Sequence, residues 1–209
     1  MASDGAQTQP RIIGLTGPIG CGKTTVGDLL LEIGARERID ADRVVHGLLG
    51  PHTRVTAAVA SRFGRAILDP EGGVDRLKLA SIVFSDDAAL RDLEAITHPA
   101  VRDEIRTRLD AWRGTDEVIV LDAIKLLQSD LLPLCEVVWL VECEPAQQMD
   151  RLVSDRGMTE GAARARIAAQ PSFDHGAVTA IIANSGTLAQ LRDKVVAAWT
   201  AYRDSAAMR

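Results

Sequence analysis

The stretch GPIGCGKTT, residues 17–25, has the spacing of a loop that binds phosphate. Glycines allow successive backbone N–H groups to point at phosphate oxygens, and a helix that begins here adds the partial positive charge of its N-terminus. In loops of this kind the lysine reaches the β- and γ-phosphates of a nucleotide, and the threonine hydroxyl ligates Mg²⁺. We therefore predict a nucleotide site. The residues expected to form it are Gly17, Gly20, Cys21, Gly22, Lys23, Thr24 and Thr25.

Cys21 lies inside this loop, and we expect only its backbone to contact phosphate, so that its side chain stands in for a smaller residue. The other cysteines are Cys135 and Cys143. An odd number of cysteines without a CxxC pair predicts neither a disulfide framework nor a zinc site, and it fits a reducing cytoplasm.

Two carboxylates, Asp40 and Asp42, follow a short run that we interpret as a strand, in the stretch RIDADRV. In an open parallel sheet the carboxyl end of a strand faces the ligand crevice. A carboxylate there could accept a proton from an attacking hydroxyl or hold Mg²⁺ through water. One of the two could instead cap a helix that begins near Arg43. The spacing does not choose between these interpretations.

His98 and Pro99 interrupt a helical pattern between residues 87 and 112. The residue before a proline is restricted, so this pair favours a turn or a cap that fixes a kink over a functional histidine. Arg102 follows one helical turn later and would share a face with His98.

The polar helical stretch 146–170 carries several arginines, which usually form a solvated helix face. In a protein with a phosphate loop, such arginines can instead close over the nucleotide and stabilise charge on the transferring group. Thr159 is a candidate N-cap where this helix breaks and restarts. The stretch is a candidate lid, and its arginines are Arg151, Arg156, Arg164 and Arg166.

A strand before the loop and a helix after it must position the phosphate site. The apolar run 11–16 suits a buried strand, and the apolar stripe from Lys23 to Ile33 suits a helix that Gly34 closes. Helical stretches between further strands indicate a parallel sheet covered on both faces. The further strands are expected at 35–40, 118–123, 136–143 and 179–184.

Residues 41–113 contain helical patterns and no comparable strand, which predicts a helical subdomain. We expect it to lie beside the phosphate loop, which makes it a candidate substrate cap. The nucleotide-binding core then comprises residues 11–40 and 114–209, and residues 1–10 are expected to be a disordered tail.

The chain has 24 basic and 29 acidic side chains, giving a formal net charge of -5. This charge argues against a surface built to bind a nucleic-acid backbone. The sequence begins without a secretory signal, and no apolar run approaches the ~20 residues of a membrane span. We expect a cytoplasmic protein without nucleic-acid or membrane partners, and we favour a monomer.

Several of these stretches, in their order along the chain, resemble the dephospho-CoA kinase family. The phosphate loop alone is common to many proteins, but its combination with IDAD, FG, VFSD and ITHP is far more specific. The stretches are GLTGPIGCGKTTV (14–26), IDADRVV (39–45), RFGRAILDPEGGVDRLKLASIVFSD (62–86), LEAITHPAVRDEI (93–105), RLVSDRGMTEGAARARIAAQ (151–170) and NSGTLAQL (184–191).

The resemblance implies an α/β P-loop kinase with a five-stranded parallel sheet flanked by helices, a helical CoA-binding domain at 41–113 and a mobile lid. It implies transfer of the γ-phosphate of ATP to the ribose 3′-hydroxyl of dephospho-CoA, with Mg²⁺. On the same basis, Asp42 matches the catalytic acidic residue and Arg151 the lid arginine that faces the phosphates, while Lys23 and Thr24 match the ligands of phosphate and Mg²⁺.

The resemblance also implies residues for the acceptor and for adenine. His98 and Arg102 fall in the acceptor-binding segment, and Asn184 and Gly186 fall in the strand-loop segment near adenine. Asp40 is a further expected substrate-binding residue.

The sequence departs from the family pattern in the stretch DAIKLLQ, residues 122–128, where a Pro-Leu-Leu-x-Glu segment is usual. Lys125 in this stretch is expected to bind substrate, through a phosphate, or to pair with Asp40 or Asp122. The second lid arginine, Arg156, stands one place later than usual.

Two further departures are Pro18, where glycine is common, and Ala183, where an aspartate is usual. Two other functions remain open on the sequence. One is a nucleoside or nucleoside-monophosphate kinase, which shares the layout of loop, cap and lid. The other is a protein that holds ATP or GTP without transferring phosphate.

Overall fold

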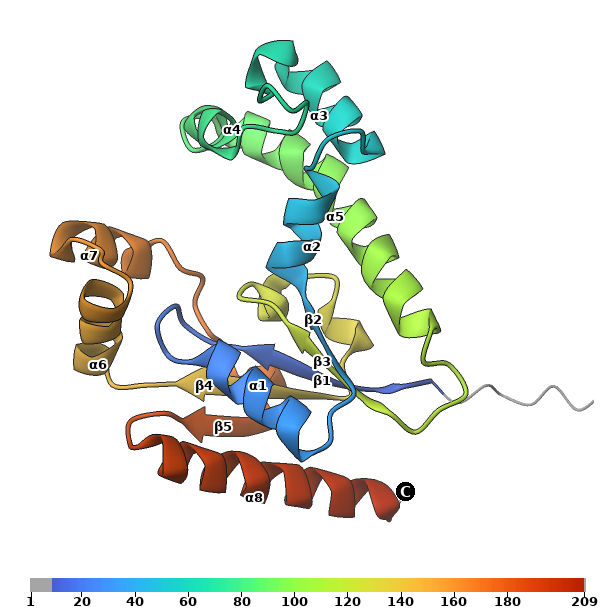
Figure 1. Ribbon diagram of the computed structural model, residues 1–209, viewed down its shortest axis with the longest axis vertical. Coiled ribbons are helices and arrows are strands. Elements are labelled where there is room, and N and C mark those ends of the chain that lie inside the picture. Colours follow the sequence, from blue (N-terminus) through green and yellow to red (C-terminus); the bar gives the residue numbers. More distant parts are fainter. Residues whose placement is uncertain (1–8, 209) are drawn as a thin grey trace, which may run out of the picture. The chain divides into compact units, whose positions relative to one another are not determined.

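The computed structural model describes residues 9–208 (Figure 1). The tail expected at residues 1–10 lies outside the described residues as far as residue 8. The chain divides into two compact units, the first formed by residues up to 39 and from 112 onward, and the second by residues 40–111. We describe each unit by itself.

The first unit is built on a five-stranded parallel sheet with the strand order β2-β3-β1-β4-β5. All five expected strands are confirmed, and their ends agree with the expectation to within two residues. Because β1 and β4 are parallel neighbours, the loops that follow them lie at the same end of the sheet. The strands are β1 (Arg11–Thr16), β2 (Glu37–Asp40), β3 (Val118–Asp122), β4 (Val137–Glu142) and β5 (Ala180–Ala183).

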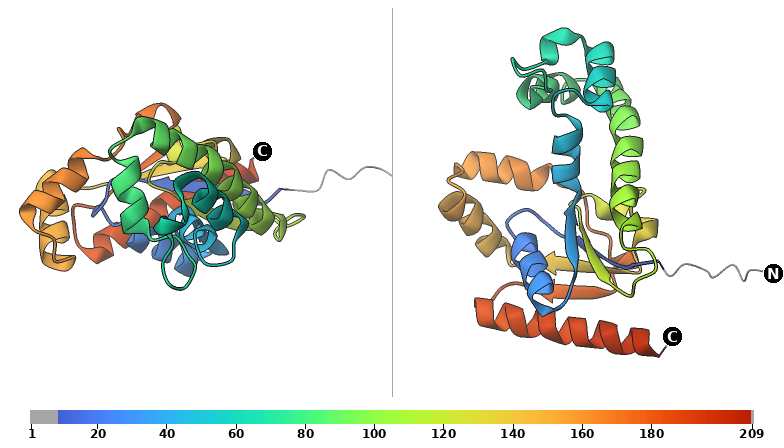
Figure 2. Two further views of the ribbon diagram at one scale, coloured as in Figure 1. Left: turned by 90° about the horizontal axis from the view of Figure 1, so that it is seen from above. Right: turned by 45° about the vertical axis from the view of Figure 1, so that its right-hand side comes forward.

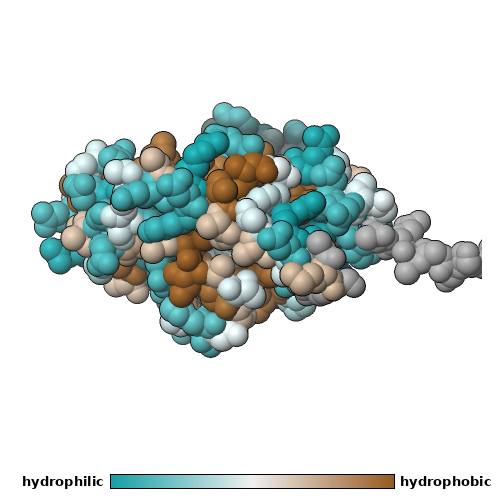
Figure 3. Space-filling view, turned by 90° about the horizontal axis from the view of Figure 1, so that it is seen from below, coloured by the Kyte–Doolittle hydropathy of each residue, from teal (hydrophilic) through white to brown (hydrophobic). Residues whose placement is uncertain are grey.

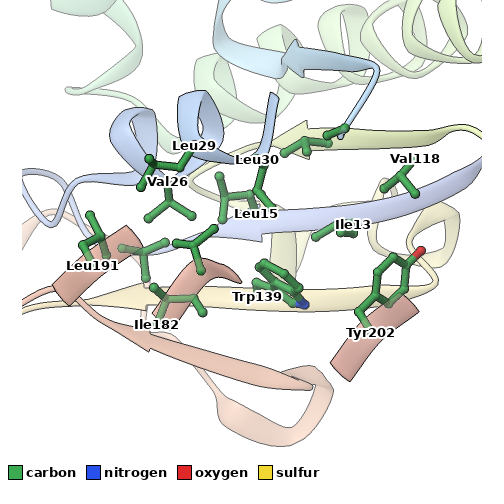
Figure 4. Close-up of a cluster of buried hydrophobic side chains, with 14 of the residues drawn as sticks. Ile13, Leu15, Val26, Leu29, Leu30, Val118, Trp139, Ile182, Leu191 and Tyr202 are labelled. Carbon is green, nitrogen blue, oxygen red and sulfur yellow. The ribbon is translucent and has the colours of Figure 1, made fainter. Parts of the chain in front are cut away.

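The main core lies on one face of this sheet. Alternate residues of the strands, such as Ile13 and Leu15 of β1, point to this face and are buried. Helices α1 (Lys23–Ile33) and α8 (Leu188–Ala207) cover them, as Figure 4 shows for Leu30 of α1 and Leu191 of α8. Burial of this apolar face holds the strand before the phosphate loop and the helix after it in place.

On the opposite face of the sheet, the side chains of Leu126 and Cys135 lie close to Gly14 of β1. A Cβ on Gly14 would lie 2.6 Å from Leu126 and 2.7 Å from the sulfur of Cys135. The remaining helical segments of this unit are η2 (Leu126–Gln128), η3 (Leu132–Leu134), α6 (Pro145–Asp150), the π-helical turn η4 (Arg151–Asp155), α7 (Glu160–Ala168) and η5 (His175–Ala177).

The second unit is helical, as expected, and has its own apolar core. Side-chain caps fix four of its helix starts: Asp40 before α2, Thr53 before α3, Asp75 before α4 and Asp86 before α5. That this unit binds CoA stays a prediction. Its helices are α2 (Ala41–Leu48), α3 (Arg54–Phe63), η1 (Arg65–Ile67), α4 (Arg76–Val83) and α5 (Asp87–Asp110).

The expected turn or cap at His98 and Pro99 is wrong. Both residues lie inside the continuous helix α5. A proline in a helix interior removes one hydrogen bond and costs about 3 kcal/mol. The following turns bury Val101, Ile105 and Leu109, and this packing favours continuation of the helix.

The surface of the described chain is mixed in polarity. No helix among the described residues has the length and apolar character needed to cross a bilayer. On the face that Figure 3 shows, hydrophobic side chains lie between hydrophilic ones.

Candidate active site

The phosphate loop connects β1 to α1, and its glycine spacing follows from close packing. Gly17 has φ 143°, and a Cβ there would lie 2.2 Å from the carbonyl oxygen of Val141 in β4. Gly22 has φ 91°, and a Cβ there would lie 2.3 Å from Nδ2 of Asn184. Only glycine fits either position without displacing a neighbour.

The N-terminus of α1 is suited to an anion. Gly22 is its N-cap, so no side chain caps the helix, and the first turn contains no acidic residue. The backbone N–H groups of that turn therefore have no capping side chain, and a helix N-terminus of this kind favours an anion. The Nζ atom of Lys23 donates to the carbonyl oxygen of Gly17 at 2.8 Å, which holds the ammonium group over the loop. Thr24 is exposed in the same turn.

Arg151 places a guanidinium group against the loop. It begins the π-helical turn η4, and its NH1 and NH2 atoms donate to the carbonyl oxygens of Gly20 at 3.4 Å and Asn184 at 3.1 Å. Arg164, by contrast, lies on the solvent-exposed face of α7 in an ion pair with Glu160. The lid arginines therefore divide between a loop contact and a solvated face.

Two glutamines that the sequence analysis missed join the lid segment to the loop. Nε2 of Gln148 donates to the carbonyl oxygen of Ile19 at 2.8 Å, and the N–H of Ile19 donates to Oε1 of Gln170. Figures 1 and 2 show the α6–α7 segment beside the loop between β1 and α1. A glutamine in a polar helical stretch resembles a solvated residue, so the sequence carries no signal for these contacts.

Asn184 supports the middle of the loop from the end of β5. It is buried, its Nδ2 atom donates to the carbonyl oxygen of Cys21 at 2.9 Å, and its N–H donates to the carbonyl oxygen of Glu142. The side chain expected near adenine is thus also part of the loop's own hydrogen bonding.

A pocket of about 340 Å³ lies along the loop and the lid segment. Three basic side chains and one acidic side chain are among its lining residues, a charge balance that favours an anion. The lining residues are Pro18, Ile19, Gly20, Gly22, Lys23, Thr24, Thr25, Arg151, Asp155, Arg156, Asn184, Gly186, Leu188 and Leu191.

The expectation about the cysteines is wrong. Cys21 and Cys143 form a disulfide, with their Cα atoms 5.1 Å apart. The side chain of Cys21 therefore does more than replace a smaller residue. Their separation of 122 residues hides the pair in the sequence, and the parallel pairing of β1 with β4 brings them together.

The other expected site residues in the second unit have different surroundings. Asp40 caps α2 by accepting a hydrogen bond from the N–H of Arg43 at 3.0 Å. Asp42 is exposed in the first turn of the same helix. In α5, His98 is exposed and Arg102 is half-buried one turn later.

Lys125 lies in the first unit, exposed, at the N-terminal end of η2. Hydrogen bonds hold the stretch DAIKLLQ, residues 122–128, on both sides of Lys125. Oγ1 of Thr16 donates to the carbonyl oxygen of Ile124 at 3.2 Å, and Nε2 of Gln128 donates to the carbonyl oxygen of Ser172 at 2.7 Å. These contacts fix the backbone on either side of Lys125.

No group of three His, Cys, Asp or Glu side chains in the described part of the chain is arranged to hold a metal ion. A Mg²⁺ ion that arrives with a nucleotide does not need such a group, because it takes most of its ligands from phosphates and water. The exposed hydroxyl of Thr24 at the start of α1 is a donor of the type that such an ion uses.

Comparison with known proteins gives a consistent family match. The family model described as dephospho-CoA kinase matches residues 11–190. The dephospho-CoA kinase of Symbiobacterium thermophilum is 43% identical over 194 residues, which are 91% of this chain and 81% of the relative. That of Streptomyces avermitilis is 42% identical over 189 residues, or 90% and 91% of the two chains.

Solved structures share the fold. The structure of TT1252 from Thermus thermophilus matches with a TM-score of 0.80 at 26% identity and covers 93% of this chain and 98% of that one. Dephospho-CoA kinase from Campylobacter jejuni matches with a TM-score of 0.61 at 22% identity, over 92% and 97% of the two chains.

Proposed function

The chain belongs to the dephospho-CoA kinase family, and from this premise we propose which of its residues carry out the reaction. The reaction is transfer of the γ-phosphoryl group of ATP to the ribose 3′-hydroxyl of dephospho-CoA, giving coenzyme A and ADP. The observation that carries the proposal is the loop 17–24 at the uncapped N-terminus of α1, within a family match that spans residues 11–190.

We propose that the loop binds the β- and γ-phosphates of ATP. The N–H groups at the start of α1 donate to phosphate oxygens, and Lys23 turns its ammonium group from the carbonyl oxygen of Gly17 to the phosphates. Such groups catalyse by position and charge, without a covalent intermediate.

Thr24 is the proposed protein ligand of Mg²⁺, and water and the nucleotide provide its remaining ligands. When bound, the ion neutralises charge that develops on the phosphate oxygens.

Arg151 is proposed to face the transferring group from the lid. Its guanidinium group donates to the carbonyl oxygens of Gly20 and Asn184, which supports a position beside the loop. Charge on the transferring phosphoryl group would compete for these donors, because a hydrogen bond to a charged acceptor is stronger than one to a carbonyl. Closure of the lid would exclude water, which otherwise competes with the acceptor hydroxyl.

Asp42 is the proposed general base, and it orients or deprotonates the 3′-hydroxyl of the acceptor. Its exposure supports this role, since the carboxylate is accessible to a ligand. Asp40, rather than Asp42, caps α2 by accepting the hydrogen bond from the N–H of Arg43.

The acceptor itself is proposed to be bound by Asp40, His98, Arg102 and Lys125. Arg102 and Lys125 are cations suited to the phosphates of dephospho-CoA. Asn184 and Gly186 are proposed to lie near adenine, and the pocket along the loop that both line supports this assignment.

A cytoplasmic monomer that acts on small molecules, without nucleic acid or a membrane, completes the proposal. The reaction consumes ATP, a metabolite of the cytoplasm, and the net charge of -5 disfavours nucleic-acid binding. Light scattering on the purified chain, with one chain's mass expected, tests the monomer.

An acceptor screen tests the function. ADP release is followed with Mg·ATP and, separately, dephospho-CoA, adenosine and AMP. We expect release with dephospho-CoA alone. Release with adenosine or AMP would indicate a nucleoside or nucleoside-monophosphate kinase, and release with none would indicate a nucleotide-binding protein.

A further inference from the structure

We propose that Cys21 and Cys143 are a reversible thiol–disulfide site that holds the phosphate loop against the end of β4 and lowers its affinity for nucleotide. The effect on nucleotide rests on the proposed function of the loop, whereas the pairing of the thiols does not.

The fold places these two residues together. Cys21 lies in the loop that follows β1, and Cys143 directly follows β4, the parallel neighbour of β1. The Cα atoms are 5.1 Å apart, which is within the range that a disulfide spans. Gly17 packs against the carbonyl oxygen of Val141, so the loop lies on the end of β4 independently of the sulfur atoms.

The exposure of the two residues indicates which of them an external disulfide meets first. Cys143 is half-buried and can be reached from solvent, whereas Cys21 is 1% exposed. Cys143 is thus the entry point, and Cys21 the thiol that resolves a mixed disulfide.

The reaction balances with a low-molecular-weight disulfide, RSSR, as oxidant. The thiolate of Cys143 attacks RSSR, forms a mixed disulfide and releases one thiolate. The thiolate of Cys21 then attacks the sulfur of Cys143 and releases the second thiolate. Two protein thiols are oxidised, RSSR is reduced to two RSH, and the protons from the protein thiols pass to the released thiolates. An excess of RSH reverses both steps.

In the disulfide-bonded loop, Cys21 is held through its backbone N–H and its sulfur. Its N–H donates to the carbonyl oxygen of Pro18 at 3.3 Å, and its sulfur is bonded to Cys143. An N–H that donates to Pro18 is not available to a phosphate oxygen. The disulfide stabilises this arrangement of the loop, so nucleotide must bind against it. By reciprocity, bound nucleotide opposes disulfide formation by the same factor.

The third cysteine serves as a control. The Sγ atom of Cys135 donates to the carbonyl oxygen of Leu131, and burial raises the pKa of this thiol to about 12. A neutral thiol is a poor nucleophile, so Cys135 is expected to stay out of the exchange. Cys135→Ser removes this thiol without touching the pair.

The first measurement is of the pairing. The full-length Cys135→Ser chain is equilibrated in glutathione buffers of increasing oxidised fraction, quenched with acid, unfolded, labelled with a maleimide and weighed by mass spectrometry. We expect both remaining thiols to disappear together, with a loss of two hydrogens and no bound glutathione. The proposal would be overturned if, in the most oxidised buffer, both thiols still react with the maleimide or each carries its own glutathione.

The second measurement is of the coupling to nucleotide. ADP binding with Mg²⁺ is measured by calorimetry on fully oxidised and fully reduced chains. We expect the oxidised chain to bind roughly tenfold more weakly, within the usual range of coupling between two sites. The Cys143→Ser chain should show one affinity in both buffers. Equal affinity of the oxidised and reduced Cys135→Ser chains, or the same loss in Cys143→Ser, would contradict the coupling.

The two proposals fail in different ways. If the reduced chain binds no ADP, the proposed function of the loop fails, while the mass measurement still decides whether the thiols pair. If the reduced chain binds ADP and its thiols never pair, only the thiol–disulfide site fails.

Discussion

Nδ2 of Asn184 lies 2.9 Å from the carbonyl oxygen of Cys21, so the residue that follows β5 supports the middle of the phosphate loop. Asn184→Ala would leave a buried carbonyl group without this donor, which costs about 1–3 kcal/mol. We expect the KM for ATP to rise roughly tenfold. Ser185→Ala, next in the chain, is the matched control, because it removes only the acceptor of the Glu144 N–H. An unchanged KM in Asn184→Ala would contradict the supporting role.

Gly22→Ala tests the close approach of the loop to Asn184. Gly22 and Gly114 both have positive φ, of 91° and 79°, so alanine is strained at either position. A Cβ at Gly22 would also lie 2.3 Å from Nδ2 of Asn184, whereas Gly114 has open space around it. We expect Gly22→Ala to lose ADP binding in calorimetry and Gly114→Ala to retain it. Equal affinities would show that the contact has no effect on the loop.

Asp42→Asn tests the proposed base. Loss of a positioned base usually lowers turnover by ~10²–10⁴-fold. We expect such a fall in kcat with ADP binding unchanged. Asp87→Asn is the control, since Asp87 is also an exposed acid in the first turn of a helix. Wild-type turnover in Asp42→Asn would remove that residue from the mechanism.

Arg151→Ala tests the lid. An arginine that stabilises the transferring phosphoryl group usually raises kcat by roughly 10³–10⁵-fold. We therefore expect Arg151→Ala to lower kcat by about this factor. Arg164→Ala, a lid arginine in an exposed ion pair with Glu160, should leave kcat unchanged, because such pairs contribute little. Steady-state kinetics with dephospho-CoA distinguish the two variants. Similar kcat values for both would place Arg151 outside the catalytic step.

The disulfide should also raise thermal stability. It closes a loop of 122 residues, and the chain-entropy model assigns about 5 kcal/mol to loops of this size. For a chain of this length that corresponds to a rise in Tm of roughly 10–20 °C. Melting curves of oxidised and reduced Cys135→Ser chains measure it, with Cys143→Ser as control. The same Tm in both states would contradict the model.

The strands and helices could be predicted because their patterns are local. An apolar run ended by glycines predicted β1, an apolar run flanked by polar segments predicted β4, and the apolar stripe after Lys23 predicted α1. The local conformation at Pro99 could not be predicted. The rule about proline favours a turn or cap there, and it omits the tertiary packing that buries Val101 and Ile105 in α5.

The phosphate loop could also be predicted, because its glycines are fixed by backbone geometry. Contacts made by residues far apart in the chain could not. The bond between Cys21 and Cys143 and the hydrogen bond from the N–H of Ile19 to Gln170 depend on which strands are neighbours. For the two aspartates, residue type allowed either one as the cap, and the start of α2 selects Asp40.

The most direct test of the central claim is to identify the product. The purified, reduced chain is incubated with Mg·ATP and dephospho-CoA, and phosphorus NMR with mass spectrometry follows the acceptor. We predict one new phosphomonoester, on the ribose 3′-hydroxyl, formed in equal amount with ADP and absent with Lys23→Ala. ADP formed without a new phosphomonoester, or unchanged dephospho-CoA, would contradict the account.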